Sequence, residues 1–264
     1  MQKRAQSEFP RAGSAIAAFM KEDVEGEVWE WQQGSKGHKL LFWSKNTSEG
    51  QKIAEQLSRM LVWLGVPKPI TVVLWYIDAP RILRATEWPA AEHVNGGWTI
   101  PNTSTIFIYR QEEWDRVVFH ELIHALGWDW QMPETPLACW DFPHKSEVYP
   151  HLFEAWTELL AEWMWVNWHG EEYGAWIKQR QWQTHQAAQV LARWSKGPWK
   201  EDTNIFAYYV LKAAMAPYIA PLLLKGPGKP EERDRFLCSL NWQSGHSVKP
   251  EKPVDLSMRM TCEI

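Results

Sequence analysis

Cysteine is scarce in this chain, and that scarcity limits the classes of protein to which it can belong. Only three of its 264 residues are cysteines, Cys139, Cys238 and Cys262. They are odd in number, widely separated and without CxxC spacing. This pattern argues against a disulfide framework and a cysteine-based metal site, and it favours a reducing compartment.

Long apolar segments are also missing. No uninterrupted run of 18 or more apolar residues occurs, so we expect no membrane-spanning helix. The first 20 residues lack a continuous apolar segment of the length that a signal peptide requires. We therefore expect a cytoplasmic or otherwise intracellular protein.

Positive charge is not in excess. The chain has 28 Lys and Arg against 32 Asp and Glu, which gives a net charge of −4 and an isoelectric point near 6.2. This balance gives no sign of a nucleic-acid partner or of binding to an anionic membrane. Tryptophan, in contrast, is abundant, with 20 residues. Because many of them recur at helical spacing, we assign them to core and groove lining rather than to a carbohydrate platform.

The segment His120-Glu121-Leu122-Ile123-His124 has the H-E-x-x-H spacing of a zinc-binding helix. Side chains four residues apart lie on the same face of a helix, so both imidazoles can bind one Zn²⁺ ion. Glu121 then lies beside the open side of the metal, where it can take a proton from the activated water. Acidic residues before the motif, apolar residues at spacings of 3 and 4, and Gly127 after it predict a helix over 111–127. The alternative is an ordinary amphipathic helix with two histidines.

The residues before this motif predict a mixture of strands and helix. A hairpin is expected at 98–100 and 105–109, directly before the metal helix. We expect an extended peptide or protein substrate to bind along the edge strand Thr105–Tyr109, although a purely structural hairpin is an equal alternative. The other expected elements are strands at 28–31, 39–43 and 70–77, a helix at 48–64, and a surface segment at 79–91 that carries Arg81 and Arg84.

The residues after the motif are mainly helical in pattern. Helices are expected at 151–168, 171–194, 202–215 and 229–240. The sequence therefore predicts an α+β fold, with a small mixed sheet and a metal-binding helix followed by a helical C-terminal half. We place the division between an N-terminal α/β subdomain at 1–130 and a C-terminal subdomain at 131–264.

Two histidines do not complete a zinc site, so a third protein ligand must lie elsewhere. The metzincin pattern H-E-x-x-H-x-x-G-x-x-H is excluded, because its last position is Trp130. Asp129, His144 and His151 are weaker alternatives. The strongest candidates are Glu154, Glu158 and Glu162, which lie on one face of the helix predicted at 151–168. Because apolar residues surround them, part of this face should be covered, and covered carboxylates require a cation or hydrogen-bond donors.

These residues resemble a known group. His120 to His124, followed by Thr157-Glu158-Leu-Leu-Ala161-Glu162, is similar to the gluzincin type of zincin metallopeptidase, including lethal-factor-like enzymes. The resemblance implies a zincin-like fold with Glu158 as the third zinc ligand and Glu162 as a carboxylate that supports a ligand histidine. Glu154 is the rival ligand, because Glu154-x-x-x-Glu158 also resembles the pattern of thermolysin-like enzymes.

A further likeness is to uncharacterised metallopeptidases of large DNA viruses, over 94–162 and again around 204–212. The gluzincin resemblance also implies an additional donor for the oxyanion, and Tyr149 is our first choice for it. His151, Tyr208 and Tyr209 are the alternatives.

The leading functional prediction is a zinc-dependent peptidase with Glu121 as general base. The alternative is a catalytically silent zincin-fold protein that holds a structural zinc and binds a partner through a Trp-rich cleft. Retention of Glu121 favours the enzyme, since a structural zinc site needs no general base.

Overall fold

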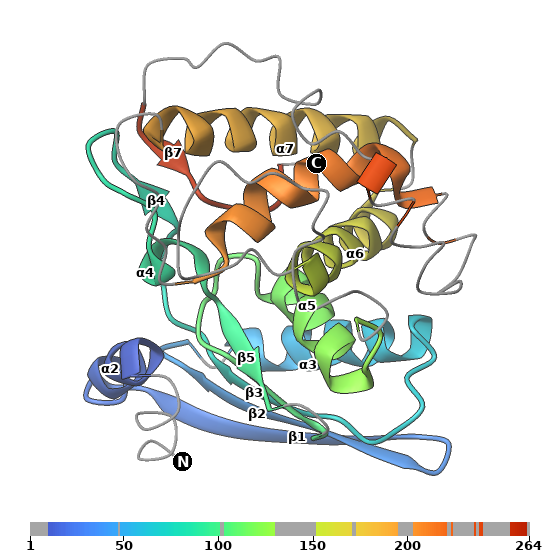
Figure 1. Ribbon diagram of the computed structural model, residues 1–264. Helices are drawn as coiled ribbons and strands as arrows, with labels where there is room; N and C mark the ends of the chain where they lie inside the picture. The colour runs from blue at the N-terminus through green and yellow to red at the C-terminus, as the bar shows by residue number, and fades with distance from the viewer. Residues whose placement is uncertain are drawn as a thin grey trace. The chain divides into compact units, whose positions relative to one another are not determined.

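The computed structural model describes residues 10–46, 48–100, 103–129, 152–170, 173–194, 203–220 and 254–262, together with Leu223, Arg235, Cys238 and Ser239. Contacts between Cα atoms divide the chain into two compact units (Figure 1). Unit 1 comprises Met1–Pro80 and Gly96–Gly127, and unit 2 comprises Arg81–Asn95 and Trp128–Ile264. The segment Arg81–Asn95 thus groups with residues that follow it by more than thirty positions.

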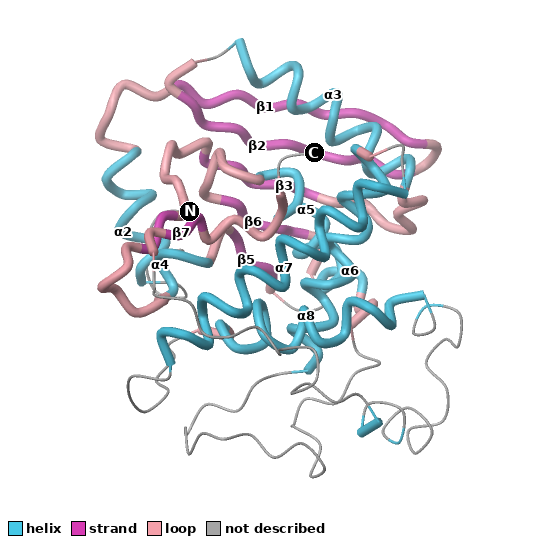
Figure 2. Tube along the Cα trace, turned by 90° about the horizontal axis from the view of Figure 1, so that it is seen from above, coloured by secondary structure: helices cyan, strands magenta, loops and turns pink. Residues whose placement is uncertain are grey.

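Unit 1 contains a five-stranded mixed sheet in the order β1-β2-β3-β6-β5 (Figure 2). The three inner strands β2, β3 and β6 are parallel, and β1 and β5 are antiparallel strands at the two edges. The bounds are β1 Glu25–Gln33, β2 Lys36–Ser44, β3 Thr71–Trp75, β5 Gly97–Thr99 and β6 Thr105–Ile108. The fold of the described residues is therefore α+β with a small mixed sheet.

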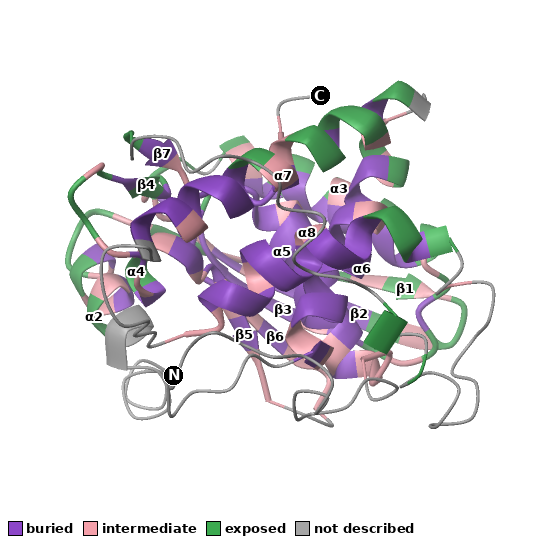
Figure 3. Cartoon of the chain, turned by 45° about the horizontal axis from the view of Figure 1, so that its top comes forward, coloured by how far each residue is buried: buried purple, intermediate pink, exposed green. Residues whose placement is uncertain are grey.

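Successive side chains of these strands point to opposite faces of the sheet, and both faces are covered. Phe42 belongs to the face on which α3 (Ser48–Trp63) packs, because a Cβ at Gly50 of α3 would lie 3.2 Å from its ring. The opposite face packs against α2 (Pro10–Phe19) in a cluster that includes Ile16, Phe19, Val73 and Trp75. Strands covered on both faces have continuous apolar sequences, as β3 does, and its residues are mostly buried (Figure 3).

Several tryptophans form a ladder across the α2 face of the sheet. Trp75 stacks on Trp43 at 5.6 Å and on Trp98 at 6.1 Å between ring centroids, and Trp98 stacks on Phe107 at 4.9 Å. Trp75 and Trp98 are buried. The assignment of tryptophan to the core is confirmed for these two residues.

Unit 2 is mainly helical. Its two long helices are α6 (Leu152–His169) and α7 (Tyr173–Trp194), and β4 (Ile82–Leu83) pairs with β7 (Leu256–Ser257). The remaining elements are α4 (Ala91–Val94), the π-helix η1 (Phe206–Leu211), α8 (Lys212–Met215) and the 3₁₀-helix η2 (Ala216–Tyr218).

Most of the predicted elements that fall on described residues are confirmed, with small changes in their bounds. These are the strands β1, β2 and β3, the β5–β6 hairpin, and the helices α3, α6 and α7. The helix expected at 202–215 is a π-helix followed by a short α-helix. The helix expected at 229–240 lies almost wholly outside the described residues.

Two expectations are corrected. The segment at 79–91 was expected at the surface, and Arg84 is exposed there, but Arg81 is 0 % exposed and its Nε donates to the Val94 carbonyl at 2.9 Å. Its charge is therefore held inside unit 2 by a backbone acceptor. The cysteine pattern argued against a disulfide framework and for a reducing compartment, but Cys238 is disulfide-bonded, whereas Cys262 is a free thiol.

No helix among the described residues combines the length and the apolar character that crossing a bilayer requires.

Candidate metal centre

The predicted metal helix is α5 (Trp114–Leu126). Glu113 precedes it in the left-handed region, at φ 57°. Gly127 ends it at φ 67°, with its N–H directed to the carbonyls of Ile123 and His124, so the predicted C-cap is confirmed. Near this end, the Lys68 ammonium donates to the Ala125 carbonyl at 2.7 Å, where the helix dipole favours a cation.

His120 and His124 project from one face of α5, as their spacing requires. The His120 Nε2 and His124 Nε2 atoms are 3.1 Å apart, and the rings are nearly perpendicular at 75°. Two nitrogens bound at about 2.0–2.1 Å to a tetrahedral zinc ion would lie about 3.3–3.4 Å from each other. The two imidazoles therefore fit a shared metal ion with little movement. His120 is buried and His124 is half-buried.

Glu121 is held beside the edge strand β5. Its side chain is 5 % exposed, and its backbone carbonyl accepts a hydrogen bond from Thr99 Oγ1 at 3.2 Å. Gly97 allows this close approach, because a Cβ there would lie 2.6 Å from the Phe107 carbonyl oxygen, 2.7 Å from Val117 Cγ1 and 3.3 Å from Glu121 Cγ. The position of Glu121 thus depends on a glycine in the neighbouring strand.

The strand that could accept an extended peptide differs from the one predicted. Thr105–Tyr109 was expected to be an edge strand, but β6 pairs with β3 on one side and with β5 on the other. Its backbone groups are used by two neighbours. Among the described strands, the one at the edge of the sheet beside α5 is β5, Gly97–Thr99.

Glu162 does not have the surroundings expected of a carboxylate that supports a ligand histidine. It is 0 % exposed, and its Oε1 forms an ion pair with the Lys212 ammonium. Its Oε2 accepts hydrogen bonds from Gln183 Nε2 and, at 2.9 Å, from Gln179 Nε2. These contacts join α6, α7 and α8 in the core of unit 2, and both carboxylate oxygens of Glu162 bind partners other than a histidine.

Burial dominates the ionisation of Glu162. The pKa of Glu162 is raised to about 7, and desolvation is the main cause. The charge of Lys212 opposes this rise, the nearby Glu158 adds to it, and the hydrogen bonds from Lys212 and Gln183 lower the pKa. Lys212 thus only partly offsets the cost of burying the carboxylate.

The other two carboxylates of α6 have different surroundings. Glu158 is 1 % exposed, whereas Glu154 is half-buried. The Tyr208 hydroxyl, in η1, donates to Glu154 Oε2 at 3.2 Å. A phenol that orients a carboxylate is typical of the groups that surround metal ligands. Tyr208, expected to help the oxyanion, is therefore bound to the candidate ligand Glu154.

Three other candidate residues, Tyr149, His151 and His144, lie outside the described residues. Tyr209 is 0 % exposed and its hydroxyl donates to the Met258 carbonyl at 2.8 Å, which makes it a core residue.

Three residues that bind the Glu162 carboxylate were not predicted from the sequence. Gln179 and Gln183 are buried on one face of α7, and their spacing of four residues was a signal for them. Lys212 gave no such signal, since its partner Glu162 lies 50 residues earlier.

Comparisons of the chain with protein-family models, with curated proteins and with solved structures found no match.

Proposed function

We propose that the protein is a zinc-dependent peptidase of the gluzincin type with a zincin-like fold. The observation that carries this proposal is the convergence of His120 Nε2 and His124 Nε2, 3.1 Å apart, on a helix that also carries Glu121. An ordinary pair of helical histidines needs no adjacent carboxylate, whereas metal-assisted hydrolysis needs a base at this position.

A glutamate of α6 completes the proposed ligand set. The resemblance favours Glu158, and the hydrogen bond from Tyr208 favours Glu154. Glu162 is not proposed, because its carboxylate serves the ion pair with Lys212. When bound, zinc would acidify a water molecule and polarise the scissile carbonyl.

The chain's own residues would move the proton and hold the substrate. Glu121 would take a proton from the attacking water and pass it to the leaving amine. Its low exposure of 5 % would keep bulk water from competing for that proton. Among the described residues, no strand pairs with the outer edge of β5, so an extended substrate could add there as a further strand.

Cleavage of a peptide library with and without a chelator tests the activity. We expect chelator-sensitive cleavage that returns when zinc is added. Glu121→Gln should reduce the rate by about 10²–10⁴-fold, the usual contribution of a general base, while zinc stoichiometry stays unchanged. Glu55→Gln, the same change on the exposed side of α3, is the matched control and should behave as the wild type.

Zinc stoichiometry of two further variants identifies the third ligand. Glu158→Gln and Glu154→Gln remove one candidate each, and the loss of zinc from one of these variants identifies the third ligand. Zinc binding without chelator-sensitive cleavage in any peptide pool would favour the alternative of a binding protein with a structural zinc.

A further inference from the structure

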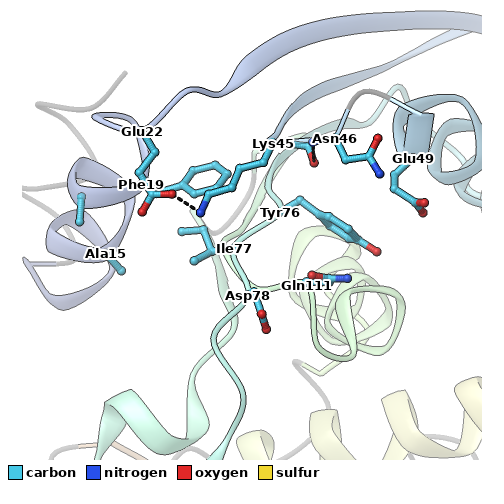
Figure 4. A pocket seen from close by; sticks show the side chains of 12 residues that line it. Ala15, Phe19, Glu22, Lys45, Asn46, Glu49, Tyr76, Ile77, Asp78 and Gln111 are labelled. Atoms are coloured by element: carbon cyan, nitrogen blue, oxygen red, sulfur yellow. Dashed lines mark hydrogen bonds and ion pairs between the residues drawn. The ribbon is translucent and has the colours of Figure 1, made fainter.

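Unit 1 has a cavity of about 460 Å³ that the proposed metal centre does not use (Figure 4). Its lining includes residues 44–46 at the end of β2, residues 76–78 after β3, and Gln111 shortly after β6. The three strands are parallel, so their carboxyl ends lie at the same edge of the sheet. We call this cavity the strand-end pocket.

Both the position and the size of the strand-end pocket suit a ligand. In open sheets of this kind, ligands bind outside the carboxyl ends of parallel strands, where loops from neighbouring strands separate. Cavities of about 300–1,000 Å³ are typical of small-molecule sites.

The charged groups of the pocket determine which ligand it can take. Glu22, Glu49 and Asp78 contribute three carboxylates against the single ammonium of Lys45, which leaves two formal negative charges. The positive end of α3 lies at this edge, but a helix end amounts to only about half a charge. This negative balance disfavours an anionic ligand and favours a cation.

These carboxylates differ in how far they are already neutralised. Lys45 forms an ion pair with Glu22, as the dashed line in Figure 4 shows. Glu49 Oε1 is 3.9 Å from the Lys52 ammonium, which is 75 % exposed, so water screens this pair strongly. Within the described part of the chain, the exposed Asp78 carboxylate has no hydrogen-bond or ion-pair partner.

An aromatic ring lies between the acidic groups. Figure 4 shows Tyr76 between Glu49 and Asp78, and Phe19 lines the opposite end of the pocket. Burial and the nearby Glu49 raise the pKa of Tyr76, so its phenol stays neutral. A neutral ring beside carboxylates attracts organic cations through its face as well as through the charges.

We propose that the strand-end pocket binds an organic cation through an ammonium or guanidinium group, with Asp78 and Glu49 as its principal acceptors. The cation is either a free small molecule or a basic side chain of a peptide. The site does not depend on the metal centre, and the measurements are made with chelator present so that zinc cannot contribute.

The test compares two ligands of similar shape, one charged and one neutral. Nα-acetyl-arginine methylamide carries the guanidinium, and Nα-acetyl-citrulline methylamide is its neutral analogue. By calorimetric titration of the full chain, we expect the arginine compound to bind about tenfold or more tightly, with affinity falling as salt rises. Equal binding of the two compounds, or binding of neither, would overturn the proposal.

Three variants locate the binding. Asp78→Asn combined with Glu49→Gln should weaken the arginine compound about tenfold or more, while Glu55→Gln should leave it unchanged. Lys45→Met should strengthen binding, because it releases Glu22, and a purely structural role for Lys45 would not produce that gain. Wild-type affinity in the double variant would assign the binding to another surface.

A second pair of ligands distinguishes the sources of the cation. Agmatine binding more tightly than a Gly-Arg-Gly amide indicates a free small molecule, and the reverse order indicates a peptide side chain.

Discussion

At the scale of single residues, Gly97 connects the sheet to the proposed general base. A Cβ there would meet the Phe107 carbonyl oxygen at 2.6 Å, and a backbone atom cannot rotate away as a side chain can. We expect Gly97→Ala to lower the free energy of unfolding by about 1–3 kcal/mol, as overpacking does. It should also reduce peptidase activity more than stability alone explains, because the shift reaches Glu121.

Gly174 provides the matched control for this substitution. It lies in α7, and a Cβ there would have no heavy atom within 4 Å. Gly174→Ala should therefore be neutral or stabilise by up to about 1 kcal/mol, as expected for alanine in a helix. Denaturant titration measures both variants, and equal effects at the two sites would contradict the argument from close approach.

His38 is a buried residue whose ionisation should affect stability. Its side chain is 1 % exposed, its ring stacks on Trp31, and its Nδ1 accepts the Ile70 N–H at 3.2 Å. Burial, followed by the charge of Lys36, lowers its pKa below 6.5. The unfolded chain therefore binds the proton first, so the free energy of unfolding should fall as the pH drops below about 6.5.

The variant His38→Asn isolates this effect, because asparagine can still accept the Ile70 N–H but does not titrate. We expect the stability of the wild type to decline more steeply below pH 6.5 than that of the variant. Chemical denaturation at several pH values gives both slopes, and parallel curves would assign the acid sensitivity to other groups.

At the scale of elements, the buried pair of Glu162 and Lys212 fixes how the helices of unit 2 pack. The pKa of Glu162 is raised from 4.5 to about 7, with burial as the main cause. The folded state therefore binds a proton more readily than the unfolded chain between these values. The contribution of Glu162 to the free energy of unfolding should therefore fall as the pH rises from about 4.5 to about 7.

Removing the Lys212 ammonium should make the stability of the protein depend more strongly on pH. In Lys212→Met the carboxylate loses the group that lowers its pKa, so ionisation becomes more costly. We expect a loss of about 3–5 kcal/mol at pH 8, the range for a broken buried pair, and a smaller loss at pH 5. Lys178→Met, at an exposed position of α7, is the control. An equal loss at both pH values would mean that Glu162 does not titrate in this range.

The elements also show what the sequence could predict. The helices α3, α5 and α6 and the strand β3 were found because apolar spacing and helix-ending residues are local signals. Whether β6 or β5 lies at the edge was not predictable, since strand order depends on pairing between distant segments. The burial of Arg81 was missed for the same reason, because its acceptor at Val94 lies 13 residues away.

The same difference between local and distant signals decides which parts of the candidate site could be predicted. His120, Glu121 and His124 follow from one motif on one helix, so the sequence alone places them together. The three glutamates of α6 share a face and a spacing, and the sequence could not separate their roles. Their contacts with Lys212 and Tyr208 in unit 2 distinguish them, and both partners lie about 50 residues further along the chain.

At the scale of the whole molecule, the proposed ligand set would combine residues that are distant in the sequence, His120 and His124 of α5 and a glutamate of α6. A metal that binds only the folded protein stabilises it by mass action, by about 2.7 kcal/mol at a concentration 100 times the dissociation constant. We therefore expect zinc to raise the melting temperature and to slow amide hydrogen exchange in α5 and α6 together.

Hydrogen exchange with and without zinc separates this ligand set from a site confined to α5. Protection of α5 alone would mean that no glutamate of α6 binds the metal. The variant His124→Ala should abolish the protection of both helices, because two remaining ligands bind zinc too weakly to compete with water. His185→Ala, at an exposed position of α7, is the matched control and should leave the protection unchanged.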